Sequence, residues 1–451
     1  MTAPRPADLD RRALALLSLG HLTVDTCQGA VPALLPFLIA ARGYTVAAAA
    51  VLVMGATVAS SVVQPVFGIL SDRVRRPWMM PAGVAVAGVG IALAGALPTY
   101  VATLAAVVVS GLGVAAYHPE GSRSARLASG ARKGTGMSLF SVGGNAGFAL
   151  GPILVTPLVL GFGLTGTLAL LVLPAIVAVV LTTQLGRLEH PRTADRADGA
   201  RGGAARPATA AGAVAAVAAE PAGEGIDRPG AFARLAGAVA CRSVLYFGLL
   251  TFVPIWFVRE LHTSKATGNG ALTVMLISGA TGTLIGGRLA DRFGARRVFV
   301  FSMALAVPMA AGFLAVGVVP AFVLLGLAGG TIIATFSVSV VLGQALLPSR
   351  VGVASGITLG LSIGIGGMAA ALLGLLADAT SLTLALGVAV AFGALAGALG
   401  WTVPDVGGRA SRPVRDAPPE RGPPTRPPAR PSPLSLPAGA RARRWQRTRT
   451  G

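Results

Sequence analysis

Twelve stretches of the chain are apolar enough and long enough to cross a lipid bilayer as helices. They fall at residues 13–37, 46–70, 78–97, 100–118, 134–158 and 164–183, and then at 232–257, 268–287, 298–317, 320–344, 351–376 and 381–401. About 20 apolar residues span the hydrocarbon core. Inside that core the backbone must satisfy its own hydrogen bonds, which a helix does. The sequence therefore predicts an all-α membrane protein with twelve transmembrane helices.

The charge pattern agrees with this class and argues against nucleic acid as a partner. Hydrophobic residues make up 53% of the chain and charged residues only 12%, about half the charge of a typical soluble domain. The net charge of +20 would suit nucleic acid if it covered one face. The basic residues instead gather in alternate loops and in the C-terminal tail, as the positive-inside rule requires. Membrane lipids are therefore the expected surroundings.

The same asymmetry predicts orientation. One set of loops holds Arg73, Arg75, Arg76, Arg123, Arg126, Arg132, Lys133, Arg288, Arg292, Arg296, Arg297 and Arg350, whereas the opposite set holds only Arg42, Arg259 and Lys265. Both termini are therefore expected in the cytoplasm of a cell whose plasma membrane holds the protein. The first apolar run contains Asp25 and lacks a small-residue cleavage site, so it is interpreted as an uncleaved helix.

A loop that occurs twice divides the chain into halves. Residues 68–76 and 287–297 both place an Asp-Arg pair four residues after a glycine, at Asp72 and Asp291, and 291 − 72 = 219 residues is about half the chain. Repeats at this scale are typical of transporters. The expected organisation is a cytoplasmic N-terminus (1–11), a six-helix half (12–183), a flexible cytoplasmic linker (184–231), a second six-helix half (232–402) and a disordered Pro- and Arg-rich cytoplasmic tail (403–451).

The first apolar stretch contains the clearest candidate for proton chemistry. His21, Asp25 and Gln28 are spaced to share one face of a helix. A charge inside the bilayer costs several kcal/mol and is a functional hypothesis by default. Burial disfavours the ionised carboxyl group, so Asp25 is expected to take up and release a proton. The alternative is a polar contact that joins two helices.

Arg242 in the seventh stretch is a candidate for binding an anion. The half-chain spacing maps it onto the segment from His21 to Asp25, because 242 − 219 = 23. A buried arginine requires an anion, which could be Asp25, an acidic substrate or each in turn. The alternatives are a permanent salt bridge, or a side chain that reaches the cytoplasmic surface.

Further polar candidates occur in other helices. His118 and Glu120 close the fourth stretch and could titrate, or could mark an ordinary helix end. Asn145 lies in a glycine-rich segment of the fifth stretch and could donate to a substrate or join helices. Gln28 and Gln64 are further candidates for substrate binding, although Gln64 also suits packing or gating.

With these segments in view, the chain resembles a major facilitator transporter over residues 12–402, and within that superfamily the fosmidomycin-resistance family. The segments that carry the resemblance are 20–25, 60–68, 117–121 and 136–145. The resemblance implies a central cavity and cytoplasmic gates formed by Gly68, Asp72, Arg73, Gly287, Asp291 and Arg292. Gly147, Gly151 and Pro152 are similar to the fifth-helix motif of drug/proton antiporters.

One departure from the superfamily pattern bears on coupling. The fourth-helix motif places an arginine three residues before the position of Ser110, where this chain has Val107. Proton coupling would then depend on Asp25, His21, His118, Glu120 or Arg242. The leading hypothesis is proton-coupled efflux of a small polar or anionic toxic compound, as in fosmidomycin resistance. The partners are a small-molecule substrate and protons, the protein is expected to be a monomer, and the proton gradient is its energy source without a cofactor.

Three other functions agree less well with the sequence. A metabolite permease of the same superfamily, working in either direction, is the alternative within transport. An intramembrane metal-dependent hydrolase would need three or four converging ligands, and no His-Glu-x-x-His spacing is present, so neither an enzyme nor a metal site is expected. A receptor would need a folded domain outside the membrane. Cys27 and Cys241 lie within apolar stretches and suggest no disulfide framework.

Overall fold

The first half of the chain forms six membrane-length segments. A computed structural model describes residues 9–64, 67, 76–130, 132–189 and 226–405. The first half contains α1 (Arg11–Arg42), α2 (Val46–Val62), α4 (Met79–Ala96), α5 (Tyr100–Ala128), α6 (Lys133–Phe162), and a last span made of the 3-10 segment η1 (Leu164–Leu171) and α7 (Val172–Thr183). A short helix, α8 (Leu185–Glu189), follows.

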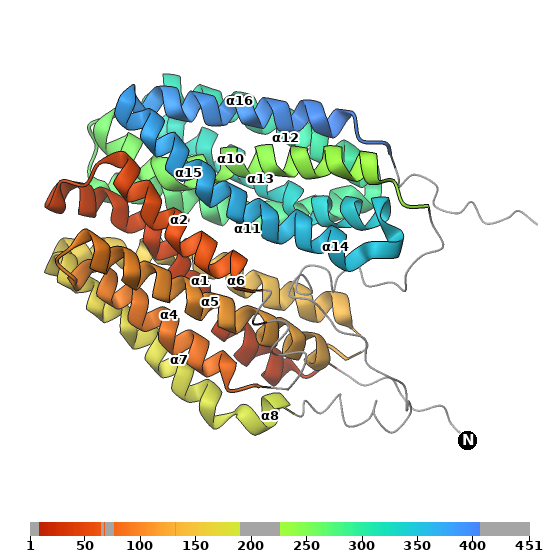
Figure 1. Ribbon diagram of the computed structural model, residues 1–451, viewed down its shortest axis with the longest axis horizontal. Helices are drawn as coiled ribbons and strands as arrows, with labels where there is room; N and C mark the ends of the chain where they lie inside the picture. The colour runs from red at the N-terminus through yellow and green to blue at the C-terminus, as the bar shows by residue number, and fades with distance from the viewer. Residues whose placement is uncertain (1–8, 65–66, 68–75, 131, 190–225, 406–451) are drawn as a thin grey trace, which may run out of the picture. The chain divides into compact units, whose positions relative to one another are not determined.

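The second half repeats this arrangement. It contains α10 (Pro229–Arg259), α11 (Lys265–Phe293), α12 (Ala295–Gly312) with η3 (Phe313–Ala315), α13 (Val318–Leu346), η4 (Pro348–Arg350), α14 (Val351–Gly356), the π-helical turn η5 (Ile357–Leu361), α15 (Ser362–Ala379) and α16 (Leu382–Trp401). In Figure 1 the helices coloured red to yellow group together, as do those coloured green to blue. The expected all-α fold of twelve membrane spans is confirmed for the described residues, since ten helices are long and apolar enough to cross a membrane and two shorter apolar helices complete the halves.

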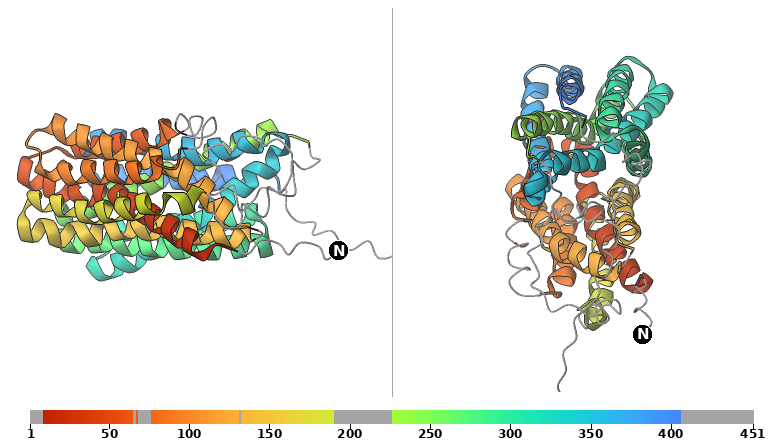
Figure 2. Two further views of the ribbon diagram at one scale, coloured as in Figure 1. Left: turned by 90° about the horizontal axis from the view of Figure 1, so that it is seen from below. Right: turned by 90° about the vertical axis from the view of Figure 1, so that its right-hand side faces the viewer.

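Successive spans run in opposite directions, which gives the bundle two distinct ends. We call the end where α1 begins and α16 finishes the terminal end, and the opposite end the far end (Figure 2). Four helices that begin at the far end have a Ser or Thr N-cap that accepts a backbone hydrogen bond, namely Thr45, Thr99, Ser264 and Ser381. Such caps satisfy amides that otherwise have no partner in the helix.

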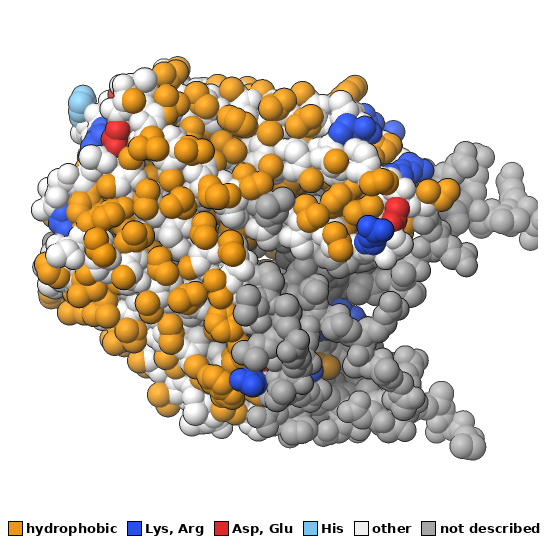
Figure 3. Space-filling model, in the orientation of Figure 1, with side chains coloured by type: hydrophobic (Ala, Val, Ile, Leu, Met, Phe, Trp, Pro, Cys, Tyr) orange, Lys and Arg blue, Asp and Glu red, His pale blue; other side chains and the backbone are white. Residues whose placement is uncertain are grey.

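Arginine and lysine side chains mark the two ends, and apolar side chains cover the flank between them (Figure 3). The cations of the far end are Arg42, Arg259 and Lys265, whereas most described arginines lie at helix ends or in loops at the terminal end. Arg42 holds neighbouring helices together, because its guanidinium donates hydrogen bonds to Gly95 O at 2.5 Å and to Thr103 Oγ1 at 2.8 Å. This contact joins α1 to α4 and α5.

Helices α1 and α6 lie against each other through a stripe of glycines. A Cβ atom added at Gly143, Gly147 or Gly151 would lie within 2.4 Å of the α1 backbone at Ser18, Leu22 and Gly29 respectively. Only residues without a side chain permit such an approach, as in many membrane helix pairs. The segment expected to resemble an antiporter motif therefore sets the spacing between α1 and α6.

Described polar contacts between the halves lie at the far end. Asp378 of α15 accepts hydrogen bonds from Val46 N and Ala47 N at 2.9 and 2.8 Å, at the start of α2. Asn269 of α11 donates to Ala33 O of α1 and to Thr156 Oγ1 of α6. All described residues belong to one compact unit.

The fourth span differs from the sequence prediction. It was expected to finish at residue 118, but α5 continues through Pro119 to Ala128. Proline removes one backbone hydrogen bond, yet the following turns remain helical because Glu120, Ser122, Ser124 and Ala125 are buried against neighbouring helices. The idea that His118 marks a helix end is therefore wrong. The predicted gate residues Gly68, Asp72 and Arg73 lie outside the described residues, as do most of the linker and the tail.

Candidate functional site

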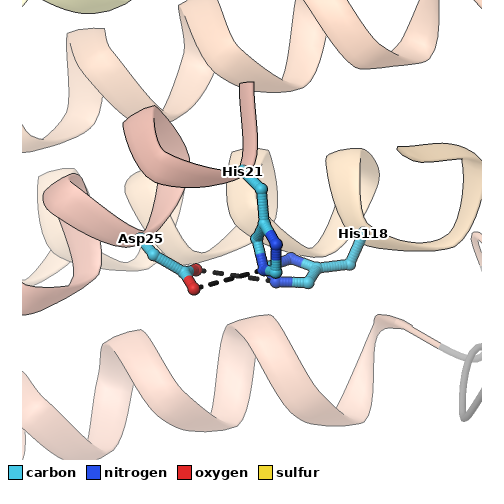
Figure 4. Close-up of side chains that lie close together, drawn as sticks. All are labelled: His21, Asp25 and His118. Carbon is cyan, nitrogen blue, oxygen red and sulfur yellow. Dashed lines mark ion pairs between the residues drawn. The ribbon is translucent and has the colours of Figure 1, made fainter. Parts of the chain in front are cut away.

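Three titratable side chains meet in the middle of the first half (Figure 4). His21 Nε2 lies 3.3 Å from Asp25 Oδ2, and His118 Nε2 lies 3.5 Å from Asp25 Oδ1. His21 and Asp25 come from α1 and His118 from α5, and Asp25 lies about 21 Å along the axis from the first residue of α1. We call these three residues the His–Asp cluster.

Hydrogen bonds to the backbone fix both imidazole rings. His21 Nδ1 lies 2.8 Å from Phe140 O of α6, and His118 Nδ1 lies 2.8 Å from Val114 O of α5. A carbonyl oxygen only accepts, so both Nδ1 atoms must carry hydrogen. In a neutral ring the Nε2 atom then presents a lone pair, and here it faces a carboxylate that also presents lone pairs. Each of the two Nε2–carboxylate contacts therefore becomes favourable only when a proton, or another cation, lies between the nitrogen and the oxygen.

The walls of the His–Asp cluster are closely packed. The His21 ring stacks on Phe140 with centroids 4.2 Å apart, and it meets the His118 ring edge-on at 5.0 Å. Gly144 of α6 closes the cluster, because a Cβ there would lie 2.5 Å from His21 Nε2 and 2.6 Å from Asp25 Oδ2. Tyr117 fixes the neighbouring turn by donating to Leu17 O at 2.5 Å. Burial in this setting strengthens electrostatic effects on the carboxylate.

Arg242 lies inside the second half, and no acidic side chain among the described residues lies beside it. Its side chain is 1% exposed, and its Nε has no hydrogen-bond partner in the part of the chain that the structure describes. The guanidinium lies 5.1 Å from the centre of the Phe336 ring of α13. Neither the permanent salt bridge nor the surface-reaching side chain considered from the sequence is present among the described residues. The pairing with Asp25, one of the two anions considered for Arg242, is likewise not formed, since Asp25 faces the two histidines.

Tyr246 connects the two regions electrostatically. It follows Arg242 by one helical turn on α10, and it lies within electrostatic range of both Arg242 and Asp25. Tyr117 of α5 also lies within electrostatic range of Asp25. Arg242 and Asp25 form no ion pair among the described residues, although Tyr246 interacts electrostatically with both.

A cavity of about 970 Å³ lies between α1 and α6 in the terminal half of these helices, and none of the three cluster residues lines it. It runs between α1 and α6, with Arg11 and Arg132 at its terminal end and Leu22 and Ala146 at its inner end. Its described wall is otherwise mainly apolar and contains no acidic side chain.

The remaining predicted residues take other positions. Glu120 is buried 3.8 Å from Arg123 and stays outside the His–Asp cluster. Gln28 Nε2 donates to Ser60 Oγ of α2 at 3.2 Å, so it joins helices. Asn145 and Gln64 are half-buried, Asn145 directly after Gly144 and Gln64 just beyond α2. Gly287 lies on α11, and both Asp291 and Arg292 are exposed at its terminal end.

Three groups that shape the site could not be identified from the sequence. They are Gly144, the Phe140 carbonyl and the Phe336 ring, of which Gly144 lies in the glycine-rich segment of the fifth apolar stretch. The three ligand-capable atoms of His21, Asp25 and His118 lie within 4.8 Å of one another, a convergence that sequence spacing could not show because His118 comes from another helix.

Buried ionisable side chains and a duplicated half of six membrane spans define a multi-pass membrane transporter. The family model of the Major Facilitator Superfamily matches residues 17–358 and 235–448. The chain belongs to the major facilitator superfamily.

Two curated relatives match nearly the whole chain. The uncharacterized MFS-type transporter YfnC of Bacillus subtilis (strain 168) is 30% identical over 403 residues, which cover 89% of this chain and 95% of that protein. The fosmidomycin resistance protein of Escherichia coli (strain K12) is 30% identical over 399 residues, covering 87% and 92%. The expected resemblance to the fosmidomycin-resistance family is thereby confirmed.

Solved structures agree on the fold. A bacterial homologue of the human lysosomal transporter Spinster, in an inward-facing and occupied conformation, has a TM-score of 0.69 at 14% identity, covering 86% of this chain and 96% of that chain. The nucleoside transporter NupG has a TM-score of 0.66 at 13% identity, covering 87% and 99%. At this identity the likeness concerns the fold alone.

Proposed function

We propose that the protein is a proton-coupled exporter of a small polar or anionic toxic compound, with a phosphonate such as fosmidomycin as the reference substrate. The observation that carries the substrate class is Arg242. A buried guanidinium without a carboxylate partner among the described residues is suited to an incoming acid, because its planar fork binds carboxylate or phosphonate oxygens at two points. A cavity for lipophilic cations would instead be expected to contain an acid.

The His–Asp cluster supplies the coupling in this proposal. Each His–Asp contact requires a cation to be favourable, and a proton is the smallest cation that can enter so closely packed a site. Protons that load the cluster from one side and leave on the other would provide the energy for uphill export. Because Asp25 and Arg242 do not touch, protons and substrate act on each other through a change of conformation and not by competing for one ion pair.

Orientation and surroundings follow from the charge asymmetry. We propose that the terminal end, which carries most of the described arginines, faces the cytoplasm, and that the protein acts as a monomer in the plasma membrane. The cavity between α1 and α6 then opens to the cytoplasm, the side from which an exporter takes its substrate. The name of the Escherichia coli relative supports the substrate class.

Expression in a sensitive host tests the substrate. We expect tolerance to fosmidomycin or a similar small acid to rise more than tolerance to ethidium, a lipophilic cation. Arg242→Gln should remove the protection, and Arg242→Lys, which keeps the charge but loses the fork, should weaken it. Arg234→Gln on the same helix is the control, because Arg234 is exposed. Protection against cations alone that survives Arg242→Gln would overturn the substrate class.

Proteoliposomes test the coupling. Asp25→Asn keeps the size of the side chain but cannot ionise, so accumulation driven by a pH gradient should vanish while substrate exchange partly survives. Normal uphill transport by Asp25→Asn would show that this carboxyl group is a structural contact.

A further inference from the structure

A single carboxamide at the far end binds both helices that enclose the His–Asp cluster. Asn269 of α11 is 1% exposed, and its Nδ2 donates to Ala33 O of α1 at 3.1 Å and to Thr156 Oγ1 of α6 at 2.9 Å. Asn269 belongs to the second half and its two partners belong to the first. The two hydrogen bonds of this one side chain therefore depend on the positions of both α1 and α6.

The partners fix the orientation of this amide. The Thr156 hydroxyl donates to Pro152 O at 2.7 Å, so its oxygen accepts from Asn269. The Ala33 carbonyl can only accept, and the NH₂ group must therefore face both. Asn269 Oδ1 is left buried without a hydrogen-bond partner among the described residues. An unsatisfied buried acceptor costs free energy, so this contact is weaker than a fully satisfied amide would make it.

The same two helices respond to the contents of the His–Asp cluster. His21 on α1 donates to Phe140 O of α6, and Gly144 of α6 abuts both His21 and Asp25. A change in proton occupancy alters the His21–Asp25 contact, and on the side of Gly144 the cluster can expand only by moving α6 relative to α1. Farther along, these helices carry Thr156 and Ala33. The geometry at Asn269 therefore depends on how α1 and α6 are placed at the cluster.

We propose that Asn269 is a positioning residue that couples occupancy of the His–Asp cluster to closure of the far end. The proposal rests on the proposed function, in which protons occupy the cluster. When α1 and α6 have the spacing seen here, one amide reaches both acceptors and the far end is held closed. When the spacing changes, one of the two hydrogen bonds is lost and the far end opens more readily. Beyond the cluster's own members, the described titratable groups within electrostatic range of Asp25 are Cys27 of α1, Tyr117 of α5 and Tyr246 of α10.

Asp378 provides a comparison within the same molecule. Its carboxylate accepts from two amides at the N-terminus of α2, a favourable position for a negative charge. It too joins the halves at the far end, but its hydrogen bonds involve neither α1 nor α6. In this proposal Asp378 helps to close the far end, and its hydrogen bonds do not depend on the proton occupancy of the His–Asp cluster.

A double-mutant cycle read by distance measurements tests the coupling. Nitroxide labels are placed at Ala41→Cys and Ala266→Cys, both exposed at the far end in different halves, in a protein whose Cys27 and Cys241 are replaced by alanine. In lipid nanodiscs, Asp25→Asn should change the ratio of long to short distances severalfold. Asn269→Leu, which is similar in shape, should raise the long-distance population and abolish the response to Asp25→Asn.

Two further variants keep the test decisive. Thr156→Val removes only the α6 arm of the contact and should also abolish the response, even if Asn269→Leu fails to fold. Asp378→Asn should raise the long-distance population and preserve the response. The proposal is overturned if Asn269→Leu or Thr156→Val leaves the response to Asp25→Asn intact, or if Asp25→Asn changes no distance. Substrate class is tested separately by drug tolerance, so a failure here is distinguishable from a failure of the proposed function.

Discussion

His118 of α5 directs its Nε2 at Oδ1 of Asp25 on α1, 3.5 Å away, while its Nδ1 is held by the carbonyl of its own helix. The ring can therefore turn only by breaking that backbone hydrogen bond. The His118 side chain is 19% exposed, against 10% for His21. His118 is thus the member of the His–Asp cluster that is nearer to water.

Replacing His118 should impair coupling more than replacing Glu120, which lies two residues further along α5. His118→Gln keeps a hydrogen-bonding side chain but cannot carry a proton at physiological pH. Losing one charge-assisted hydrogen bond costs roughly 1.5–3 kcal/mol, so proton-driven uptake into inverted vesicles should fall by about tenfold or more. Glu120→Gln leaves the cluster intact and should have a smaller effect. Equal losses in the two variants would count against His118 as a coupling residue.

Gly144→Ala should separate α6 from α1 at the His–Asp cluster. The added methyl group would overlap His21 Nε2 and Asp25 Oδ2, and overpacking of this kind typically costs about 1–3 kcal/mol. We expect a lower midpoint in thermal unfolding in detergent and loss of uphill transport. Gly161→Ala is the matched control on α6, because nothing lies within 4 Å of its added Cβ. A stable and fully active Gly144→Ala protein would contradict the geometry described here.

The orientation can be checked by labelling single cysteines in intact cells. A membrane-impermeant maleimide should label His262→Cys, because His262 is exposed at the far end. The same reagent should fail to label Ala200→Cys unless the cells are opened. The background protein carries alanine at Cys27 and Cys241. Labelling of Ala200→Cys from outside would reverse the proposed topology.

Asp227 outside the membrane spans should give a small acid-dependent contribution to stability. Hydrogen bonds from the Ser349 hydroxyl and backbone amide, with Arg350 nearby, hold the pKa of Asp227 below its usual 3.8. Because the folded pKa is depressed, the stabilisation is complete above the unfolded pKa and is lost as pH falls through the folded one. Asp227→Asn should therefore lower the thermal midpoint at neutral pH and lose this effect in strong acid. Asp405→Asn is the control, and a midpoint difference independent of pH would exclude this cause.

Metal removal should leave coupled transport unchanged. The three ligand-capable atoms of the His–Asp cluster are close enough to hold a divalent cation, whereas the proposed mechanism uses protons alone. Proteoliposomes prepared with EDTA on both sides should show the same pH-driven transport as untreated ones. A loss restored by added zinc would replace the proton with a metal ion in the proposal.

Most of the fold could be predicted from the sequence because the length and composition of membrane helices are strongly constrained. Hydrocarbon thickness sets the length of each span, and the paired loops at Asp72 and Asp291 revealed the two halves. The predicted end of the fourth span at residue 118 was wrong, because a proline such as Pro119 usually ends a helix but does not end α5. Burial of Glu120 and the turns after it outweighs the single lost hydrogen bond.

The site was less predictable because it depends on contacts between helices. The i, i+4 spacing placed His21 and Asp25 on one face, and the intramembrane charge of Asp25 marked it as important. Two contacts depend on how neighbouring helices rotate and pack. His118 approaches Asp25 from α5, and Arg242 lies over the Phe336 ring and does not pair with Asp25. Periodicity within one helix carries no information about the rotation of its neighbour.

The π-helical turn η5 at Ile357–Leu361 gives the membrane span made of α14 and α15 a built-in hinge. Such a turn accommodates one extra residue, and one residue corresponds to about 100° of rotation around the axis. A helical wheel drawn through α14 and α15 as one helix would therefore assign the residues before the turn to the wrong side. Bulges of this kind are also places where helices bend. The segment from Val351 to Gly356 can consequently swing while Asp378, beyond the hinge, stays on the start of α2.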